Sequence, residues 1–255
     1  MKKWSLVLAV CLAVLGLMTS PAWAQGGAGA QPIFTYVDEW GVPRGQWGPM
    51  EKSNADVKPL LDALVADGTL LGYGFFENRV HSDGGYTHGG WFQARSVGNI
   101  LKALERIYAQ PANVTNSAQA ASKHQDYLMI ATTHGAKAVT NATGYLRVIS
   151  VAIQPGHMDG FTEIYNRYLK PVYDQLLADG AIVSYQLDTE WNIQNAPGRI
   201  FSAVVMPNAE AIDKVNMAFG DMFAKNPAVI EGILSHVVPD SRQDLLARIT
   251  QMTRK

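Results

Sequence analysis

The stretch KPLLDALVADG at residues 58–68 decides the fold, because it returns as KPVYDQLLADG at residues 170–180. Seven of the eleven positions are identical at an offset of 112 residues. A second pair of stretches, residues 125–132 and 243–250, begins each time with Gln-Asp and ends with Thr. Self-similarity of this kind is the signature of a repeated structural unit. The sequence therefore predicts a tandem duplication.

Each copy has the same order of strand-like and helix-like segments. Residues typical of strands cover 34–40, 70–81, 91–96 and 127–134 in the first copy and 146–153, 182–191, 199–206 and 245–251 in the second. Apolar residues at helical spacing predict two helices between them in each copy. Pro59 and Pro171 should kink the first helices, because proline lacks a backbone donor. Gly68 and Gly180 should end these helices in a left-handed turn.

The predicted order β-α-β-β-α-β is that of the ferredoxin-like split motif. We expect a first repeat over residues 31–137, a linker over 138–144 and a second repeat over 145–255, preceded by a disordered segment at 25–30. A sheet with both helices on one face leaves its other face uncovered, and two such sheets can cover each other. The expected fold class is α+β, with the two repeats packed sheet to sheet as an intramolecular α+β barrel.

Residues 1–24 have the composition of a secretory signal peptide. A pair of lysines precedes an apolar run at residues 6–18, and the small-residue pattern Ala-Trp-Ala follows at 22–24. The run is shorter than the ~20 residues that a membrane span needs. We therefore expect cleavage before Gln25 and a periplasmic or secreted protein with no membrane association. Cys11 is the only cysteine, and its loss with the signal excludes disulfides and thiolate metal ligands.

The charge pattern disfavours a nucleic-acid partner. The chain has 21 Lys and Arg residues against 22 Asp and Glu residues, and the signal peptide removes two of the lysines. No basic run longer than two residues follows the signal, whereas nucleic-acid-binding proteins carry basic patches. We expect a small-molecule ligand instead. We also expect a monomer, because a fused pair of repeats has less need to dimerise.

The duplication, the order of elements and the Ala-Asp-Gly ends of the first helices together resemble the dimeric α+β barrel superfamily in a fused two-copy form. Residues 31–252 carry this resemblance. The superfamily includes antibiotic-biosynthesis-type monooxygenases, EthD-like and NIPSNAP-like proteins, and haem-binding relatives of chlorite dismutase and dye-decolorising peroxidase. The resemblance rests on topology, so it implies the fold and carries over no catalytic residue.

Strand residues alternate between two faces, so each expected strand offers one set of side chains to the barrel lumen. In the first copy we expect the lumen to receive Tyr36, Asp38 and Trp40, then Trp91, Gln93 and Arg95, then Leu128, Ile130, Thr132 and His134. In the second copy the polar residues at such positions are Ser150, Gln154, Ser184, Gln186, Asp188, Glu190 and Ser202. The first copy concentrates aromatic, imidazole and guanidinium groups, so we expect the site there.

Three residues are candidate catalytic groups, each with a structural role as its alternative. His134 ends the last strand of the first copy, where a histidine can act as a general base or bind haem iron. Arg95 would hold developing negative charge. Because a buried arginine needs a partner, we expect it beside Asp38. The expected substrate-binding residues are Tyr36, Trp40, Trp91, Gln93 and Thr132.

A distinctive loop, HSDGGYTHGG, occupies residues 81–90. His81, Asp83 and His88 are candidate nitrogen and oxygen ligands for a metal ion. Their spacing matches no metal signature, so we prefer a glycine-rich hairpin turn with exposed polar residues and expect no metal.

Three functions remain open. The sequence contains no phosphate-binding loop, Gly-x-Ser-x-Gly elbow or dinucleotide fingerprint, which disfavours hydrolases and nucleotide-dependent enzymes. The first hypothesis is a cofactor-independent oxygenase or isomerase acting on a small, partly aromatic substrate. The second, weighed equally, is a non-catalytic periplasmic binder of a hydrophobic ligand. The third is a haem-binding protein.

Overall fold

In the computed structural model, the described part of the chain folds around a closed barrel of eight antiparallel strands. The structure describes residues 31–81, 84–110, 116–192 and 198–255. The expected signal peptide and the segment at 25–30 lie outside the described residues. Barrel closure leaves no strand edge with unpaired backbone groups.

The two halves of the chain contribute four strands each. The first half provides β1 (Ile33–Trp40), β2 (Gly72–Asn78), β3 (His88–Ala94) and β4 (His124–Ala136). The second half provides β5 (Val139–Ala152), β6 (Ser184–Glu190), β7 (Arg199–Met206) and β8 (Gln243–Arg254). The order around the barrel is β1-β3-β2-β8-β5-β7-β6-β4. Each half therefore has the ferredoxin-like arrangement of its four strands, and the predicted α+β barrel is confirmed.

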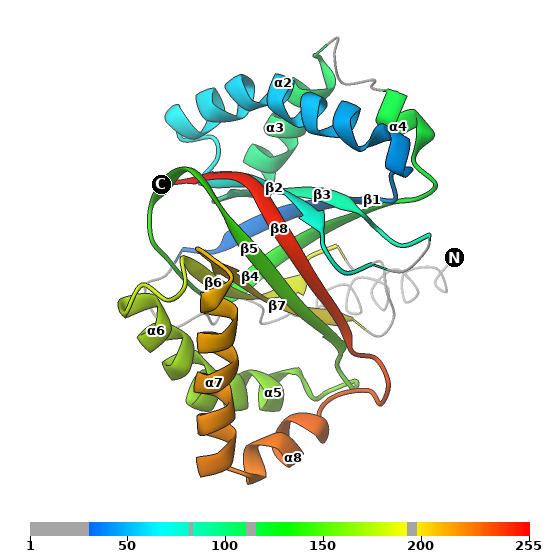
Figure 1. Cartoon of the computed structure of the whole chain (residues 1–255). Coiled ribbons are helices and arrows are strands. Elements are labelled where there is room, and N and C mark those ends of the chain that lie inside the picture. Colours follow the sequence, from blue (N-terminus) through cyan, green and yellow to red (C-terminus); the bar gives the residue numbers. More distant parts are fainter. Residues whose placement is uncertain (1–30, 82–83, 111–115, 193–197) are drawn as a thin grey trace, which may run out of the picture. The chain divides into compact units, whose positions relative to one another are not determined.

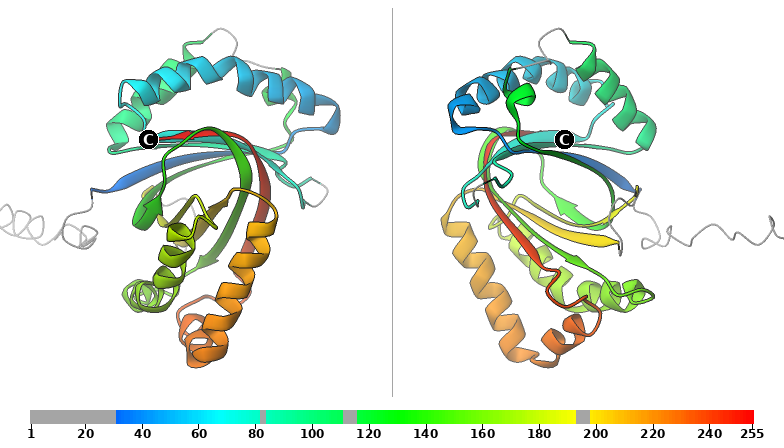
Figure 2. Two further views of the ribbon diagram at one scale, coloured as in Figure 1. Left: turned by 60° about the vertical axis from the view of Figure 1, so that its left-hand side comes forward. Right: turned by 90° about the vertical axis from the view of Figure 1, so that its right-hand side faces the viewer.

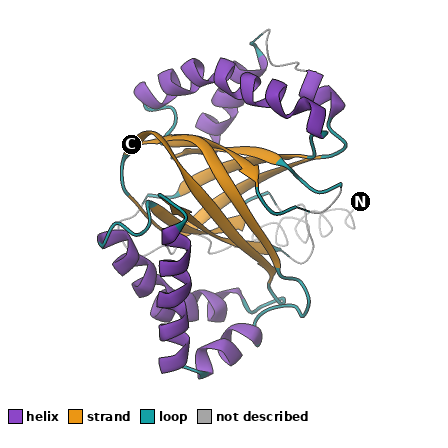
Figure 3. Cartoon of the chain, in the orientation of Figure 1, coloured by secondary structure: helices purple, strands orange, loops and turns teal. Residues whose placement is uncertain are grey.

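Helices cover the outside of the barrel in two layers (Figures 1 and 3). The first-half layer consists of α2 (Trp47–Ala66), α3 (Val97–Tyr108) and α4 (Asn116–Ala120), with a 3-10 turn at Arg44–Gln46. The second-half layer consists of α5 (Met158–Ile164), α6 (Lys170–Ala178), α7 (Glu210–Lys225) and α8 (Ala228–Leu234). Figure 2 shows the strands between these two layers. Within the described ranges, no helix is long and apolar enough to cross a membrane.

The two prolines have different effects on the first helices. Pro59 lies inside α2, which continues through it, whereas Pro171 stands at the start of α6, directly after a π-helical turn at Tyr165–Leu169. Proline supplies no N–H to the preceding turn, and the second copy accommodates this with the wider π turn. Gly68 (φ +81°) and Gly180 (φ +73°) end α2 and α6 in the predicted left-handed conformation.

A tyrosine–aspartate–lysine contact in the first half recurs in the second half at the sequence offset of 112 residues. The Tyr73 hydroxyl donates a 2.6 Å hydrogen bond to Asp62 Oδ1, and the Tyr185 hydroxyl donates to Asp174 Oδ1. Each aspartate is also ion-paired with the lysine four residues before it. These contacts tie β2 to α2 and β6 to α6, so the residues that recur in the two halves have a structural role.

Two sequence-based boundaries are wrong. The expected linker at 138–144 belongs to β5, which begins at Val139 and pairs there with the end of β8. Two register shifts and the positive φ of Asn141 (50°) interrupt the alternation in this segment, which hides the strand from pattern analysis. The last strand also runs beyond Gln251 to Arg254.

Candidate functional site

The barrel lumen contains a cavity of about 470 Å³ to which all eight strands contribute. This volume lies within the range of roughly 300–1,000 Å³ that is typical of small-molecule sites. Most of the wall is apolar, formed by side chains such as Val37, Trp91, Met129, Leu146, Phe201 and Met252. The lumen is therefore open enough to hold a ligand.

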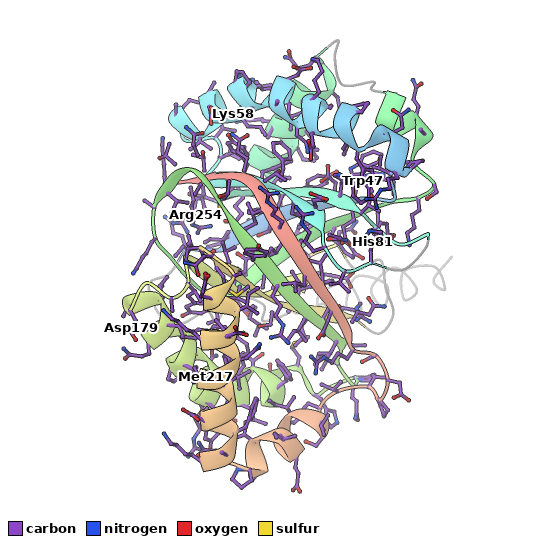
Figure 4. The ribbon with its side chains drawn as sticks, viewed as in Figure 1. Trp47, Lys58, His81, Asp179, Met217 and Arg254 are labelled. Carbon is purple, nitrogen blue, oxygen red and sulfur yellow. The ribbon has the colours of Figure 1, made fainter. Side chains whose placement is uncertain are left out.

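Polar side chains converge in this cavity near the C-terminal end of β8, where Arg254 lies (Figure 4). Arg254 Nη1 donates to Gln93 Oε1. Gln93 Nε2 donates to Gln186 Oε1 at 2.6 Å, and Gln186 Nε2 donates to Asp188 Oδ2 at 2.5 Å. Thr35 Oγ1 accepts from both glutamines, at 3.2 and 3.4 Å. The guanidinium is thus linked to the carboxylate through two aligned amides, and such bonds strengthen one another.

Asp188 has the most strongly shifted pKa in this cluster. Its side chain is 0% exposed, and burial raises the pKa of the carboxyl to about 7, although Gln186 and Arg254 act in the opposite direction. Burial also lowers the pKa of Arg254 to about 10, with the charge of Arg95 acting in the same direction. Asp188 Oδ1 has no hydrogen-bond partner among the described residues. The carboxyl can therefore exchange a proton near neutral pH.

Glu39, four residues further along β1 than Thr35, is a second carboxyl group in the cavity wall. Burial raises the pKa of the Glu39 carboxyl to about 7, and the charge of Asp38 adds to this effect. Lys123 Nζ lies 4.1 Å from the centre of the Tyr86 ring. All of these side chains except Asp38 line the cavity.

Trp91 and Gln93 occupy the lumen as predicted. The indole of Trp91 lies against the backbone of Gly74, its partner on β2. A Cβ atom at Gly74 would stand 2.3 Å from the Trp91 ring, so glycine is required there for the indole to enter the lumen. At an offset of 112 residues the second half has Gln186 in place of Gly74, and that side chain joins the polar cluster.

The prediction that Tyr36, Asp38 and Trp40 face the lumen is wrong. Tyr36 packs with the apolar residues of α2 and α3, and its hydroxyl donates to Asp126 Oδ1 at 2.7 Å. The Trp40 ring stacks on His124 at 3.7 Å. The lumen instead receives Thr35, Val37 and Glu39. Alternation separates two faces but does not say which one the helices cover, and here the helices cover the more aromatic face.

The expected pairing of Asp38 with Arg95 is also wrong. The β1–β3 register places Asp38 opposite Gly90, whose N–H donates to Asp38 Oδ1 at 2.5 Å. Arg95 is exposed and follows the last residue of β3. It is five positions beyond Gly90, roughly 16 Å away at the rise of an extended chain. Burial raises the pKa of Asp38 to about 6.

Of the residues predicted from the last strand of the first copy, Leu128, Ile130 and Thr132 do not line the lumen cavity, whereas His134 is paired with a lumen residue and shares its face of the sheet. Tyr127 and Met129 line it instead of Leu128 and Ile130. A β-bulge interrupts the β4–β6 register after Ala131, Thr132 Oγ1 donates to Leu187 O at 3.1 Å, and His134 pairs with Gln186 in the register beyond the bulge. The catalytic role of His134 stays a prediction, and the described cavity wall does not include it.

The candidate metal ligands His81 and His88 both lie against Trp47, with ring centroids 5.9 and 5.2 Å from the indole. Figure 4 shows Trp47 and His81 on the same side of the molecule. His88 is 2% exposed, and burial lowers the pKa of its imidazole. Asp83 lies outside the described residues. Among the residues that are described, no group of three or more His, Cys, Asp or Glu side chains is arranged to hold a metal ion.

Haem binding requires an iron ligand such as histidine or tyrosinate within reach of the porphyrin. Of the described residues, His81 is the one histidine that lines the lumen cavity, and it is exposed. Burial raises the pKa of Tyr73 and Tyr127, which disfavours a tyrosinate ligand. His134 is paired with Gln186, which lines the cavity, and haem binding stays a prediction.

Sequence reasoning did not identify Arg254 and gave Asp188 no catalytic role. Asp188 was placed correctly on the polar face of β6 with its partner Gln186, but the rest of the cluster, Thr35, Gln93 and Arg254, comes from three other strands. Arg254 lies beyond the predicted end of β8. A β-bulge between Ile249 and Gln251 shifts the alternation of β8, so that Leu245 lines the lumen before it and Met252 and Arg254 after it. A simple period of two does not predict this position of Arg254.

No family model matches the sequence, and no curated protein matches it either. Solved structures match the fold. A proposed monooxygenase from Lactobacillus acidophilus is 15% identical and superposes with a TM-score of 0.64, covering 88% of this chain and 97% of that chain. The chain has the dimeric α+β barrel fold. A proposed monooxygenase from Fusobacterium nucleatum subsp. nucleatum is 11% identical, with a TM-score of 0.63 over 89% of this chain and 95% of that chain.

Another relative of this dimeric α+β barrel is described as an anthrone oxidase-like protein. It is 10% identical, with a TM-score of 0.55 over 89% of this chain and 94% of that chain. At these identities the likeness concerns the fold alone. The predicted fold is confirmed, and the chemistry has to be argued from the site.

Proposed function

We propose that the lumen cavity binds a small, partly aromatic molecule and that the protein is a cofactor-independent oxygenase or isomerase. The observation that carries this proposal is the fully buried Asp188 carboxyl, with a pKa of about 7, in the wall of a largely apolar cavity. A base of this pKa is suited to removing a weakly acidic proton at neutral pH. Arg254 supplies positive charge to the same cluster, which favours an anionic intermediate.

The proposed reaction begins with transfer of a proton from a substrate C–H or O–H group to Asp188. The electron pair remains on the substrate as an enolate or phenolate, whose charge the Arg254–Gln93–Gln186 chain stabilises. In an isomerase the proton returns to a different carbon. In an oxygenase the carbanion reduces O2, so that O2 is the oxidant and the substrate is oxidised.

Anthrone is a suitable first substrate, because one structural relative is described as anthrone oxidase-like and anthrone has an acidic C–H group. Its oxidation by O2 gives anthraquinone and one water. We expect the mature protein to accelerate this reaction above the spontaneous rate, followed by absorbance, and Asp188→Asn to abolish the acceleration. Asp174→Asn, a carboxylate on α6 outside the lumen, is the matched control. The enzyme proposal fails if neither anthrone nor a panel of phenols and enolisable ketones is turned over.

The second candidate function is non-catalytic binding of a hydrophobic ligand. The apolar wall favours it, since Asp188, Gln93 and Gln186 already bond to one another and the remaining lining offers mainly apolar contact. Native mass spectrometry of protein taken from the periplasm tests this alternative. A retained small molecule without turnover would support binding alone.

We further infer that the chain is exported, and that its two halves derive from one duplicated unit. The lysine pair, the apolar run and the Ala-Trp-Ala pattern support export. The recurrent Tyr–Asp–Lys contacts and the same strand order in both halves support duplication. Intact-mass measurement of the secreted or periplasmic protein should give a chain that begins at Gln25. A mass that includes residues 1–24 would contradict export by signal cleavage.

A further inference from the structure

A second cavity of about 700 Å³ lies in the second half of the chain, on the outer face of the sheet. Strands β5 and β7 form one wall, and α5, the π-helical turn, α6, α7 and α8 form the other. Aromatic side chains line much of it: Phe161, Tyr165, Tyr173, Phe219 and Phe223. It is separated from the lumen by the sheet, since lumen-facing and helix-facing residues alternate along β7.

The strand registers explain why the second half has this space. In the first half Tyr36 on β1 pairs with Phe92 on β3, and the two rings stack 4.8 Å apart against α2 and α3. At the equivalent place in the second half, Arg147 on β5 pairs with Val204 on β7. Arg147 Nη1 donates to Asn216 Oδ1 at 2.7 Å. Two stacked rings are thus replaced by a small valine and by an arginine that bonds to α7, which leaves volume between sheet and helices.

The Tyr165 hydroxyl gives this cavity a polar anchor. The Tyr165 side chain is 1% exposed, and its hydroxyl has no hydrogen-bond partner of normal geometry among the described residues. The Ser202 hydroxyl is a polar neighbour of the Tyr165 hydroxyl and opposes the rise in pKa that burial causes, but it also lies 3.4 Å from the Tyr173 hydroxyl and can bond there instead. Tyr165 also begins the π-helical turn, a feature that often marks functional sites. A buried hydroxyl without a partner is unfavourable, so a ligand that supplies the partner gains binding energy.

The charges near the cavity indicate a neutral ligand. Arg147 and Arg242 are balanced by Asp240 and Asp244. Arg242 makes two hydrogen bonds to Asp244, at 2.8 and 2.6 Å. With both arginines engaged, no excess of charge selects an anion or a cation.

We propose that this sheet–helix cavity is a second ligand site, separate from the lumen, that binds a neutral aromatic molecule with one hydrogen-bonding group, which pairs with the Tyr165 hydroxyl. Its volume is within the range of drug-sized pockets. The aromatic walls favour ring contacts.

The test uses N-phenyl-1-naphthylamine, a neutral aromatic amine that fluoresces in apolar surroundings, titrated into the mature protein. Val204→Phe restores on β7 the ring that Phe92 provides in the first half, and should weaken binding at least ten-fold by filling the cavity. Val205→Phe is the matched control, because the adjacent Val205 faces the lumen, and it should leave the affinity unchanged. Tyr165→Phe should weaken binding about five-fold through loss of one hydrogen bond.

Each variant is first checked for folding by circular dichroism. If Val204→Phe does not fold, Val215→Trp fills the same cavity from α7 and should also weaken binding at least ten-fold. Loss of binding in Val205→Phe, with binding kept in Val204→Phe, would place the amine in the lumen and overturn the proposal. Equal affinity in wild type, Val204→Phe and Val215→Trp, or no binding to wild type, would overturn it as well. None of these readouts depends on turnover in the lumen, so the two proposals fail separately.

Discussion

The side-chain amide of Gln93 donates a 2.6 Å hydrogen bond to the amide oxygen of Gln186, although β3 and β6 are not neighbours in the barrel. Gln93 comes from the first half of the chain and Gln186 from the second, so this bond joins the halves inside the lumen. Through it, the guanidinium of Arg254 is connected to the carboxyl of Asp188. The polar cluster therefore exists only when both halves are folded.

Replacement of Gln93 by Leu should destabilise the protein by about 3 kcal/mol, because buried donors and acceptors on Arg254 and Gln186 would lose their partner at roughly 1–3 kcal/mol each. Urea unfolding measures this loss. Gln175→Leu, an exposed glutamine on α6, should change the unfolding free energy by less than about 0.5 kcal/mol. Equal effects of the two substitutions would mean that the hydrogen bonds from Arg254 through Gln93 and Gln186 to Asp188 contribute nothing to stability.

Asp188 should make the protein less stable as the pH rises. Its folded-state pKa, about 7, exceeds the ordinary value of 3.8 because of burial, so the native state binds the proton more tightly than the unfolded state. Stability is full below pH 4 and is lost progressively as the pH rises to 7. Asp188→Asn removes this loss and should be the more stable protein at pH 8, by up to about 4 kcal/mol. Urea unfolding between pH 4 and 8.5 should show a shallower pH dependence in the variant.

Asp174→Asn should behave in the opposite way. Hydrogen bonds from Lys170 and Tyr185 lower the pKa of Asp174 in spite of partial burial, so its contribution to stability is present above the unfolded-state pKa and is lost as the pH falls. The variant should therefore be less stable than wild type at pH 7 and approach it near pH 3. If Asp188→Asn showed this same dependence, the raised pKa of Asp188 would be wrong.

Gly74→Ala should displace Trp91 from the lumen wall. The new methyl group would stand 2.3 Å from the indole, and such overpacking costs about 1–3 kcal/mol. Trp91 fluorescence, isolated by comparison with Trp91→Phe, should shift toward that of an exposed indole. The double variant Gly74→Ala/Trp91→Phe should recover part of the lost stability, because the smaller ring relieves the contact. No recovery would show that the indole is not what requires glycine.

The sequence predicted the scaffold better than the site, and the reason is physical. The helix ends at Gly68 and Gly180 and the order of strands and helices follow from short-range patterns, and the positive φ of both glycines agrees with them. The face of β1 was assigned wrongly because alternation does not identify the covered side. Asp188 is connected through Gln186 to Gln93 on β3 and to Arg254 on β8, and pairings between distant strands are not encoded in any local period.

The contacts shared by the two halves lead to a matched prediction. Tyr73 and Tyr185 are 1% and 2% exposed, and each hydroxyl donates to the aspartate eleven residues before it. Because a hydrogen bond to a charged group contributes about 1.5–3 kcal/mol, Tyr73→Phe and Tyr185→Phe should destabilise the protein by similar amounts within that range. Tyr108→Phe, at a site 66% exposed, should have almost no effect. Tyr73 also accepts a 3.4 Å hydrogen bond from Gln251, so Tyr73→Phe should lower the free energy of unfolding slightly more than Tyr185→Phe does. A large effect at one tyrosine and none at the other, measured by urea unfolding, would mean that the two halves have diverged in their scaffold as well as in their lumen residues.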